Sequence, residues 1–209
     1  MQTTSYQINP EYAKLSQIVP GLFICGITEL NQYNIEKNGI TMIINATNEV
    51  KDGTISIKHF VTLICRPLLG WAIIEAVIAN GGAVLVHCIA GVSRSATICL
   101  AFLTKYRCQS LRDAYFLMLS KRPLVRPNIG FWKQLIQFEQ EVKHGQASVK
   151  LVYDETQIDH LLPDVYLDQA IQPTQPFWIT LLVVGVGILL RDKNSSKTVT
   201  LLHQMYSYK

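Results

Sequence analysis

Short apolar runs alternate with amphipathic segments over the first 145 residues. Three runs rich in β-branched residues, at 39–45, 59–65 and 83–87, are almost continuously apolar. Such runs are typical of strands that are buried on both faces of a sheet. The segment 71–79 has the apolar spacing of a helix. The pattern therefore predicts a strand–helix–strand unit in the middle of the chain.

Turn and capping residues predict the neighbouring elements. A Pro-Gly pair within 18–25 favours a tight turn between two short strands, and 31–37 predicts a short helix. Ser110 has an acidic residue three positions later, which is typical of a helix N-cap, and Asn128 can cap another helix. Strands followed by helices predict an α/β domain over 14–145, with a central, mostly parallel sheet flanked by helices.

A cysteine and an arginine enclose five residues directly after the predicted strand at 83–87. The sequence of 87–95 is His-Cys-Ile-Ala-Gly-Val-Ser-Arg-Ser. The backbone N–H groups of such a loop, at the start of a helix, can point inward and bind a tetrahedral dianion. Gly91 permits a backbone angle that a Cβ would resist, and Arg94 can offer two parallel donors to phosphate oxygens.

The same loop can activate Cys88 as a nucleophile. A helix N-terminus and nearby cationic groups can lower a thiol pKa from about 8.5 to about 3.5–7.5, which gives a thiolate at neutral pH. The alternative is a buried, inert cysteine, which is how we interpret Cys25, Cys65 and Cys99. For Cys88 the strand, the glycine and the serines that accompany it favour a phosphate site.

Residues 84–97, which contain the loop, resemble the signature of the dual-specificity protein phosphatases. The likeness continues through Arg122-Pro123 and 126–135, and 162–166 resembles the tail of the small atypical subgroup. It covers about residues 14–168. The resemblance implies a protein-tyrosine-phosphatase-like fold, with the Cys-X5-Arg loop between a central strand and a helix, and no metal or organic cofactor.

The resemblance also implies a role for each residue of the site. Cys88 would form a phosphocysteine, Arg94 would bind the phosphoryl oxygens, and Ser95 would help the thiolate leave. His87 would support the cysteine, and Asn128 would brace the loop from outside. The backbone that would hold the phosphoryl group belongs to Ile89, Ala90, Gly91, Val92 and Ser93.

One part of the family pattern is missing. The family carries a general-acid aspartate on a loop after the strand that ends here at Cys65, but the next residues are Arg-Pro-Leu-Leu-Gly-Trp. The connection to Ala83 is also shortened, as a variant transcript could explain. Asp52 and Glu75 are nearby acids that we interpret as surface charges. General acid catalysis is worth about 10²–10⁴-fold, so we expect a weak enzyme biased toward aryl phosphates. The alternative is a catalytically impaired pseudophosphatase that binds phosphoproteins.

The expected partners are phosphorylated proteins, with signalling kinases among them as the family implies. No run of aromatic and basic residues indicates nucleic-acid binding, although a lipid or RNA phosphate is a third alternative as substrate. Five cysteines without a C-x-x-C pair indicate neither a disulfide framework nor a zinc site. The first residues lack a signal-peptide pattern. We therefore expect a cytoplasmic location, with nuclear or membrane-associated locations as alternatives.

Composition divides the rest of the chain. Residues 1–13 form an N-terminal arm, 146–175 an acidic extension, 176–190 an apolar segment and 191–209 a polar tail. As a helix, the fifteen apolar residues would span only about 22 Å, whereas a bilayer core is about 30 Å thick. We therefore favour packing of 176–190 on the domain over contact with a membrane.

Overall fold

The computed structural model describes residues 13–47, 59–62, 70–153 and 161–171. Residues 1–168 belong to one compact unit, and the following account concerns that unit. Its strands are β1 (Ser16–Val19), β2 (Leu22–Gly26), β3 (Met42–Asn45), β4 (His59–Thr62), β5 (Val84–Cys88), β6 (Leu151–Tyr153) and β7 (Leu161–Pro163). Its helices are η1 (Ile27–Glu29), α2 (Gln32–Lys37), α3 (Gly70–Ala79), α4 (Arg94–Tyr106), α5 (Leu111–Lys121) and α6 (Ile129–Lys143); α7 (Val165–Ile171) begins within it.

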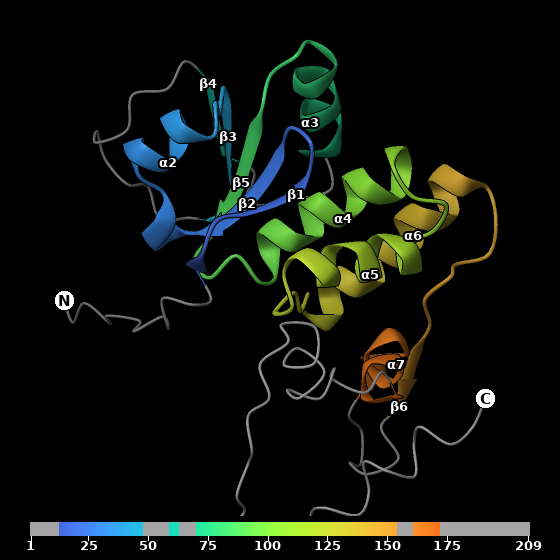
Figure 1. Cartoon of the computed structure of the whole chain (residues 1–209). Helices are drawn as coiled ribbons and strands as arrows, with labels where there is room; N and C mark the ends of the chain where they lie inside the picture. The colour runs from blue at the N-terminus through green and yellow to red at the C-terminus, as the bar shows by residue number, and fades with distance from the viewer. Residues whose placement is uncertain (1–12, 48–58, 63–69, 154–160, 172–209) are drawn as a thin grey trace, which may run out of the picture. The chain divides into compact units, whose positions relative to one another are not determined.

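A five-stranded sheet of order β1-β2-β5-β3-β4 forms the centre of the unit (Figure 1). Strands β2, β5, β3 and β4 are parallel, and β1 pairs with β2 in the antiparallel direction. Gly26 lies beside Cys88 and Asn45 beside His87, so the ends of β2 and β3 flank the end of β5. Ligands of parallel α/β sheets bind at this carboxyl edge.

Helices cover both faces of the sheet, with α2 on one side and α3, α4, α5 and α6 on the other (Figure 1). Along β5 the side chains alternate between the two cores: Val86 lies in the core with α4, and Leu85 in the core with α2. The ten residues 95–104 of α4 are all buried, which fixes the start of this helix against the sheet. The predicted α/β architecture is confirmed.

Most predicted elements are confirmed. The Pro-Gly pair joins β1 to β2, and the helix expected at 31–37 is α2. The side chains of Ser110 and Asn128 accept hydrogen bonds from backbone N–H groups of α5 and α6, as N-caps do. The strand expected at 59–65 is present at His59–Thr62, and its last residues lie outside the described ranges. Cys25 and Cys99 are fully buried, while Cys65 is outside the described ranges.

The sequence pattern did not predict the antiparallel pair β6–β7, which lies within the acidic extension. Side chains attach this extension to the helices. Glu139 of α6 accepts hydrogen bonds from the Ser148 backbone N–H at 2.8 Å and the Ser148 hydroxyl at 2.7 Å. Arg112 of α5 forms ion pairs with Asp164 and Asp168. No helix in the described ranges is long and apolar enough to span a bilayer, and 176–190 lies outside them.

Candidate active site

The Cys-X5-Arg loop connects the end of β5 to the first residue of α4, as the resemblance implied. Cys88 closes β5 and is 4% exposed. Its sulfur lies 3.1 Å from the Ser95 hydroxyl oxygen, and the Gly91 N–H donates to it at 3.2 Å. Gly91 has a φ of +69°, a left-handed conformation that glycine adopts without strain. The loop thus folds back over the thiol.

Two opposing effects act on the pKa of Cys88. Burial raises the pKa, because a thiolate loses solvation in the interior. The Ser95 hydroxyl and the backbone N–H groups of Ser95, Val92 and Gly91 stabilise the thiolate and lower the pKa. The net result is a pKa below the ordinary value of a thiol. A lowered pKa and a position at a helix N-terminus are the conditions for a nucleophilic cysteine.

Arg94 is the first residue of α4 and is half-buried. Within the described ranges it has no carboxylate partner. Its guanidinium is therefore not neutralised by a described acid. A guanidinium that starts the helix after the loop, without a carboxylate partner among the described residues, suits a phosphate ligand, because its planar donors match two phosphate oxygens.

The two residues expected to support the loop are placed differently. His87 is buried, and its backbone oxygen accepts from the Ala46 N–H at 2.9 Å. As the neighbour of Cys88 in a strand, its side chain lies on the opposite face of the sheet. Asn128 donates its backbone N–H to the Ser93 hydroxyl at 3.1 Å, while its side chain caps α6. The structure therefore brings Asn128 to the loop through its backbone.

The two acids considered as substitutes for the missing aspartate differ in what the structure shows. Glu75 lies in α3 and forms an ion pair of 2.8 Å with Arg107. Arg107 follows the last residue of α4, about 20 Å along the helix from its first. This pairing supports the interpretation of Glu75 as a surface charge. Asp52 and the segment 63–69 lie outside the described ranges.

Arg122 is a contact of the loop that the sequence analysis did not identify. It is 4% exposed and donates to the Gly91 carbonyl at 2.7 Å and to the Ala90 carbonyl at 3.1 Å. It also donates to the Lys14 carbonyl at 2.5 Å and the Ser16 hydroxyl at 3.1 Å. The signal in the sequence was the Arg122-Pro123 pair, which we interpreted only as part of the likeness to the family.

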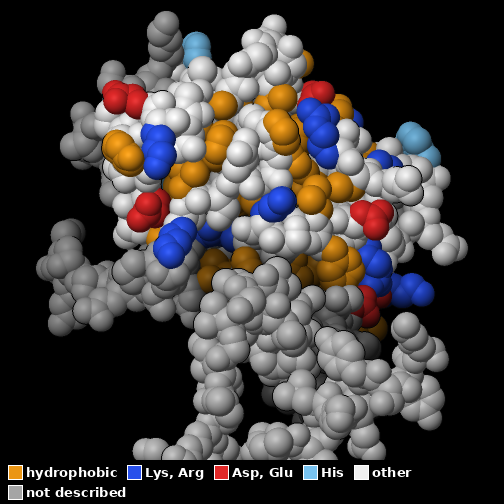
Figure 2. All heavy atoms as spheres, in the orientation of Figure 1, with side chains coloured by type: hydrophobic (Ala, Val, Ile, Leu, Met, Phe, Trp, Pro, Cys, Tyr) orange, Lys and Arg blue, Asp and Glu red, His pale blue; other side chains and the backbone are white. Residues whose placement is uncertain are grey.

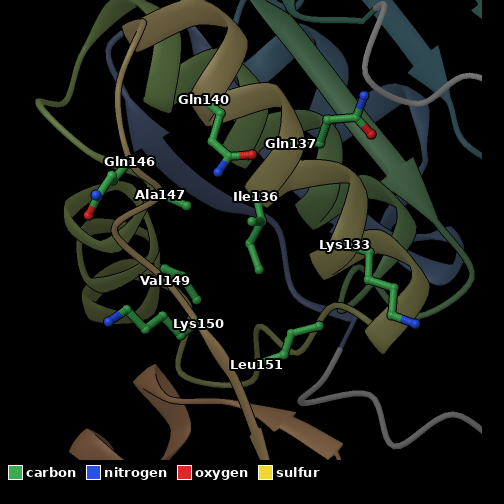
Figure 3. A pocket seen from close by; sticks show the side chains of 9 residues that line it. All are labelled: Lys133, Ile136, Gln137, Gln140, Gln146, Ala147, Val149, Lys150 and Leu151. Atoms are coloured by element: carbon green, nitrogen blue, oxygen red, sulfur yellow. The ribbon is translucent and has the colours of Figure 1, made fainter.

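A pocket of about 780 Å³ lies elsewhere, between α6 and the segment 146–151. Side chains from these two parts face each other across it (Figure 3). None of its lining residues belongs to the loop, so it is not the site of Cys88.

Lys and Arg side chains of the described residues are dispersed over the face in Figure 2. The described residues contain no group of three His, Cys, Asp or Glu that could hold a metal ion.

The parallel sheet and the loop after its central strand define the phosphatase-like class of α/β fold, and comparison with known proteins specifies the family. Residues 70–141 match the dual specificity phosphatase catalytic domain. Human dual specificity protein phosphatase 14 is 35% identical over 175 residues, which cover 78% of this chain and 86% of the relative. The chain belongs to the dual-specificity protein phosphatases and is a protein phosphatase by class.

Two solved structures show the same fold. A mouse putative dual specificity phosphatase complexed with zinc tungstate is 29% identical, with a TM-score of 0.56, and the match covers 69% of this chain and 96% of that one. The human tyrosine phosphatase-like serine/threonine/tyrosine-interacting protein is 28% identical, with a TM-score of 0.54, and the match covers 61% of this chain and 96% of that one.

Proposed function

We propose that this phosphatase works through a phosphocysteine on Cys88 and acts on phosphotyrosine and phosphoserine or phosphothreonine proteins. The observation that carries the proposal is the environment of the Cys88 sulfur, 3.1 Å from the Ser95 hydroxyl and 3.2 Å from the Gly91 nitrogen, with a lowered pKa. A thiol held as an anion under inward-facing donors is suited to attack a phosphorus atom that the same loop binds.

In the first step the Cys88 thiolate attacks phosphorus, an S–P bond forms, and the bond to the ester oxygen breaks. Arg94 and the backbone N–H groups of the loop hold the three other oxygens, where charge is concentrated. In the second step water attacks phosphorus, the S–P bond breaks, and inorganic phosphate is released. The Ser95 hydroxyl, already within 3.1 Å of the sulfur, stabilises the departing thiolate.

The leaving oxygen takes up a proton in the first step, and the sequence lacks the aspartate that would supply it. A phenol, with a pKa of about 10, leaves as an anion more readily than the alcohol of serine or threonine. We therefore propose turnover that is slow relative to an enzyme with a general acid, by up to about 10²–10⁴-fold for alkyl esters. Aryl phosphates, including phosphotyrosine, are the favoured substrates.

The test measures hydrolysis of p-nitrophenyl phosphate, a phosphotyrosine peptide and a phosphothreonine peptide by the full chain, with Cys88→Ser as control. Acid quenching after mixing with ³²P-labelled substrate traps any covalent phosphoenzyme. Cys88-dependent turnover with a trapped phosphocysteine, faster on the aryl esters, supports the proposal. Equal rates on the phosphothreonine peptide would contradict the bias toward aryl phosphates.

A phosphate-binding module is the second candidate, because the sequence lacks the general acid while it keeps Cys88 and Arg94. A structural neighbour with a phosphatase-like fold carries the name of an interacting protein. If the wild-type chain hydrolyses none of the three substrates but binds the phosphopeptides, this second function is the correct one. Signalling proteins with accessible phosphotyrosine are the partners that we propose for either function.

A further inference from the structure

The four consecutive carbonyls of residues 89–92 in the loop accept hydrogen bonds from outside the loop. Beyond the site described above, the Ile89 carbonyl accepts from the Ile27 N–H at 2.9 Å and the Val92 carbonyl from the Arg126 N–H at 2.9 Å. The two carbonyls between them, of Ala90 and Gly91, accept from a single side chain, Arg122. The loop is therefore held by its oxygen atoms, and Arg122 holds two consecutive ones.

Because peptide groups are planar, the hydrogen bonds to these carbonyls also fix the directions of the N–H groups that follow them. In a trans peptide the carbonyl of one residue and the N–H of the next point in opposite directions. An outward Ala90 carbonyl therefore turns the Gly91 N–H inward, and an outward Gly91 carbonyl does the same for the Val92 N–H. These are two of the three backbone N–H groups that lower the pKa of Cys88, against the burial that raises it.

We propose that Arg122 is a positioning residue that sets the reactivity of Cys88 by fixing these two peptide planes. This proposal deepens the proposed function and rests on it. Arg122 donates Nε to the Gly91 carbonyl and Nη2 to the Ala90 carbonyl, so one rigid guanidinium aligns both planes. Its planar shape suits this task, because its donors keep a fixed angle to each other.

The other side of the guanidinium is anchored away from the loop. Nη1 donates to the Lys14 carbonyl at 2.5 Å and to the Ser16 hydroxyl at 3.1 Å, at the start of β1. Arg122 is therefore fixed at both ends and cannot follow the loop if the peptides rotate. Burial lowers the pKa of Arg122, and the nearby sulfur groups, including Cys88, oppose this. The side chain remains a cation near the thiolate.

The same packing explains why the loop has glycine at position 91. A Cβ on Gly91 would lie 2.5 Å from Nη2 of Arg122 and 2.7 Å from the backbone carbonyl carbon of Cys25. Neither neighbour is free to move, since Cys25 is buried in β2 and Arg122 is anchored. The contact of the guanidinium with the loop therefore requires the absence of a side chain at this point.

Two effects of Arg122 on Cys88 can be separated by substitution. The positive charge attracts a thiolate whatever its hydrogen bonds, whereas the positioning effect needs two donors in fixed directions. Arg122→Lys keeps the charge and removes the second aligned donor, because an ammonium is a compact group on a flexible stem. A change in Cys88 in this variant therefore reports positioning rather than charge.

The experiment uses the full chain and two readouts that require no turnover. The first is the pH dependence of Cys88 alkylation by iodoacetamide, which reports its pKa, and the second is the dissociation constant of inorganic phosphate. In Arg122→Lys we expect the pKa of Cys88 to rise by about one unit and phosphate affinity to fall about tenfold. Both readouts remain valid if the chain does not hydrolyse substrates. Failure of this proposal can therefore be distinguished from failure of the proposed function.

Arg112→Lys is the matched control. Arg112 is also a partly buried arginine with several hydrogen bonds, but its partners are Ser148, Asp164 and Asp168 rather than the loop. This variant should lose thermal stability without a change in either readout. An unchanged alkylation profile in Arg122→Lys, or the same shift in Arg112→Lys, would overturn the proposal. If Arg122→Lys does not fold, Ser16→Ala takes its place, because it removes one anchor of the Arg122 guanidinium and keeps the charge. It should shift both readouts in the same direction, and unchanged readouts would overturn the proposal.

Discussion

Replacement of Ser95 by alanine tests whether this hydroxyl stabilises the Cys88 thiolate. The hydroxyl oxygen lies 3.1 Å from the sulfur, and Ser95 is fully buried, so water cannot take its place without a rearrangement. A hydrogen bond to a charged group contributes about 1.5–3 kcal/mol, and one pKa unit corresponds to about 1.4 kcal/mol. Ser95→Ala should therefore raise the pKa of Cys88 by about one to two units.

The alkylation rate of Cys88 as a function of pH measures this shift directly. At a pH below both values of the pKa, the variant should react about ten- to a hundredfold more slowly, because the thiolate fraction falls tenfold for each unit. Phosphocysteine should also accumulate during turnover, since the thiolate then leaves without the hydroxyl. Acid-quench trapping measures that accumulation.

Ser93→Ala is the matched control in the same loop. The Ser93 hydroxyl accepts from the Asn128 N–H at 3.1 Å, and Ser93 is not among the residues that lower the pKa of Cys88. Its alkylation profile should match that of the wild type. The reasoning fails if Ser95→Ala alkylates with the wild-type profile, or if both variants shift equally.

Three further predictions concern acids and stability. Glu75→Gln should leave kcat/KM and its pH profile unchanged, because the partly exposed ion pair of Glu75 with Arg107 contributes at most about 1 kcal/mol and lies far from Cys88. A loss of about 10²-fold or more in kcat/KM would make Glu75 a general acid. Glu139→Gln should lower the free energy of unfolding, measured by urea denaturation, by about 1–3 kcal/mol without changing kcat. The exposed Glu141→Gln should change neither quantity. Because the pKa of Cys88 is lowered in the native state, the unfolded chain binds more protons between the native pKa and the ordinary thiol pKa of about 8.5. The free energy of unfolding of the wild type, relative to that of Cys88→Ser, should therefore rise with pH across this range and stay constant above it. A difference that does not change with pH would contradict the lowered pKa.

Local signals in the sequence predicted most of the fold correctly. The Pro-Gly pair, the caps at Ser110 and Asn128, and the apolar runs each act within a few residues, so their effects are visible in a single sequence. The pair β6–β7 was missed because its strands are only three residues long and carry no alternating pattern. The residues that follow β7 are also attached to α6 by a contact distant in sequence, because the Tyr166 hydroxyl accepts from the Trp132 indole N–H at 2.8 Å across 34 positions.

The loop itself was predictable because its residues are contiguous, whereas its supports are not. Arg122 lies 31 positions after Gly91 and 108 after Lys14, so its contacts exist only once β1, β5 and α5 have packed together. A buried arginine also contradicts the usual preference of this residue for the surface. Similarly, Asn128 was expected to brace the loop, but its contact uses the backbone N–H, which every residue except proline carries.

The hydrogen bonds of the Glu139 carboxylate limit how far the chain can be shortened from its C-terminal side. The carboxylate joins three segments, because it accepts from the Leu111 N–H at 2.6 Å at the start of α5 as well as from Ser148 beyond α6. A fragment that stops at residue 145 would contain the whole catalytic loop, yet it would leave a buried carboxylate with one donor and expose the side of Trp132 that Tyr166 covers. Shortened versions made for crystallisation or screening should therefore extend at least to Asp168.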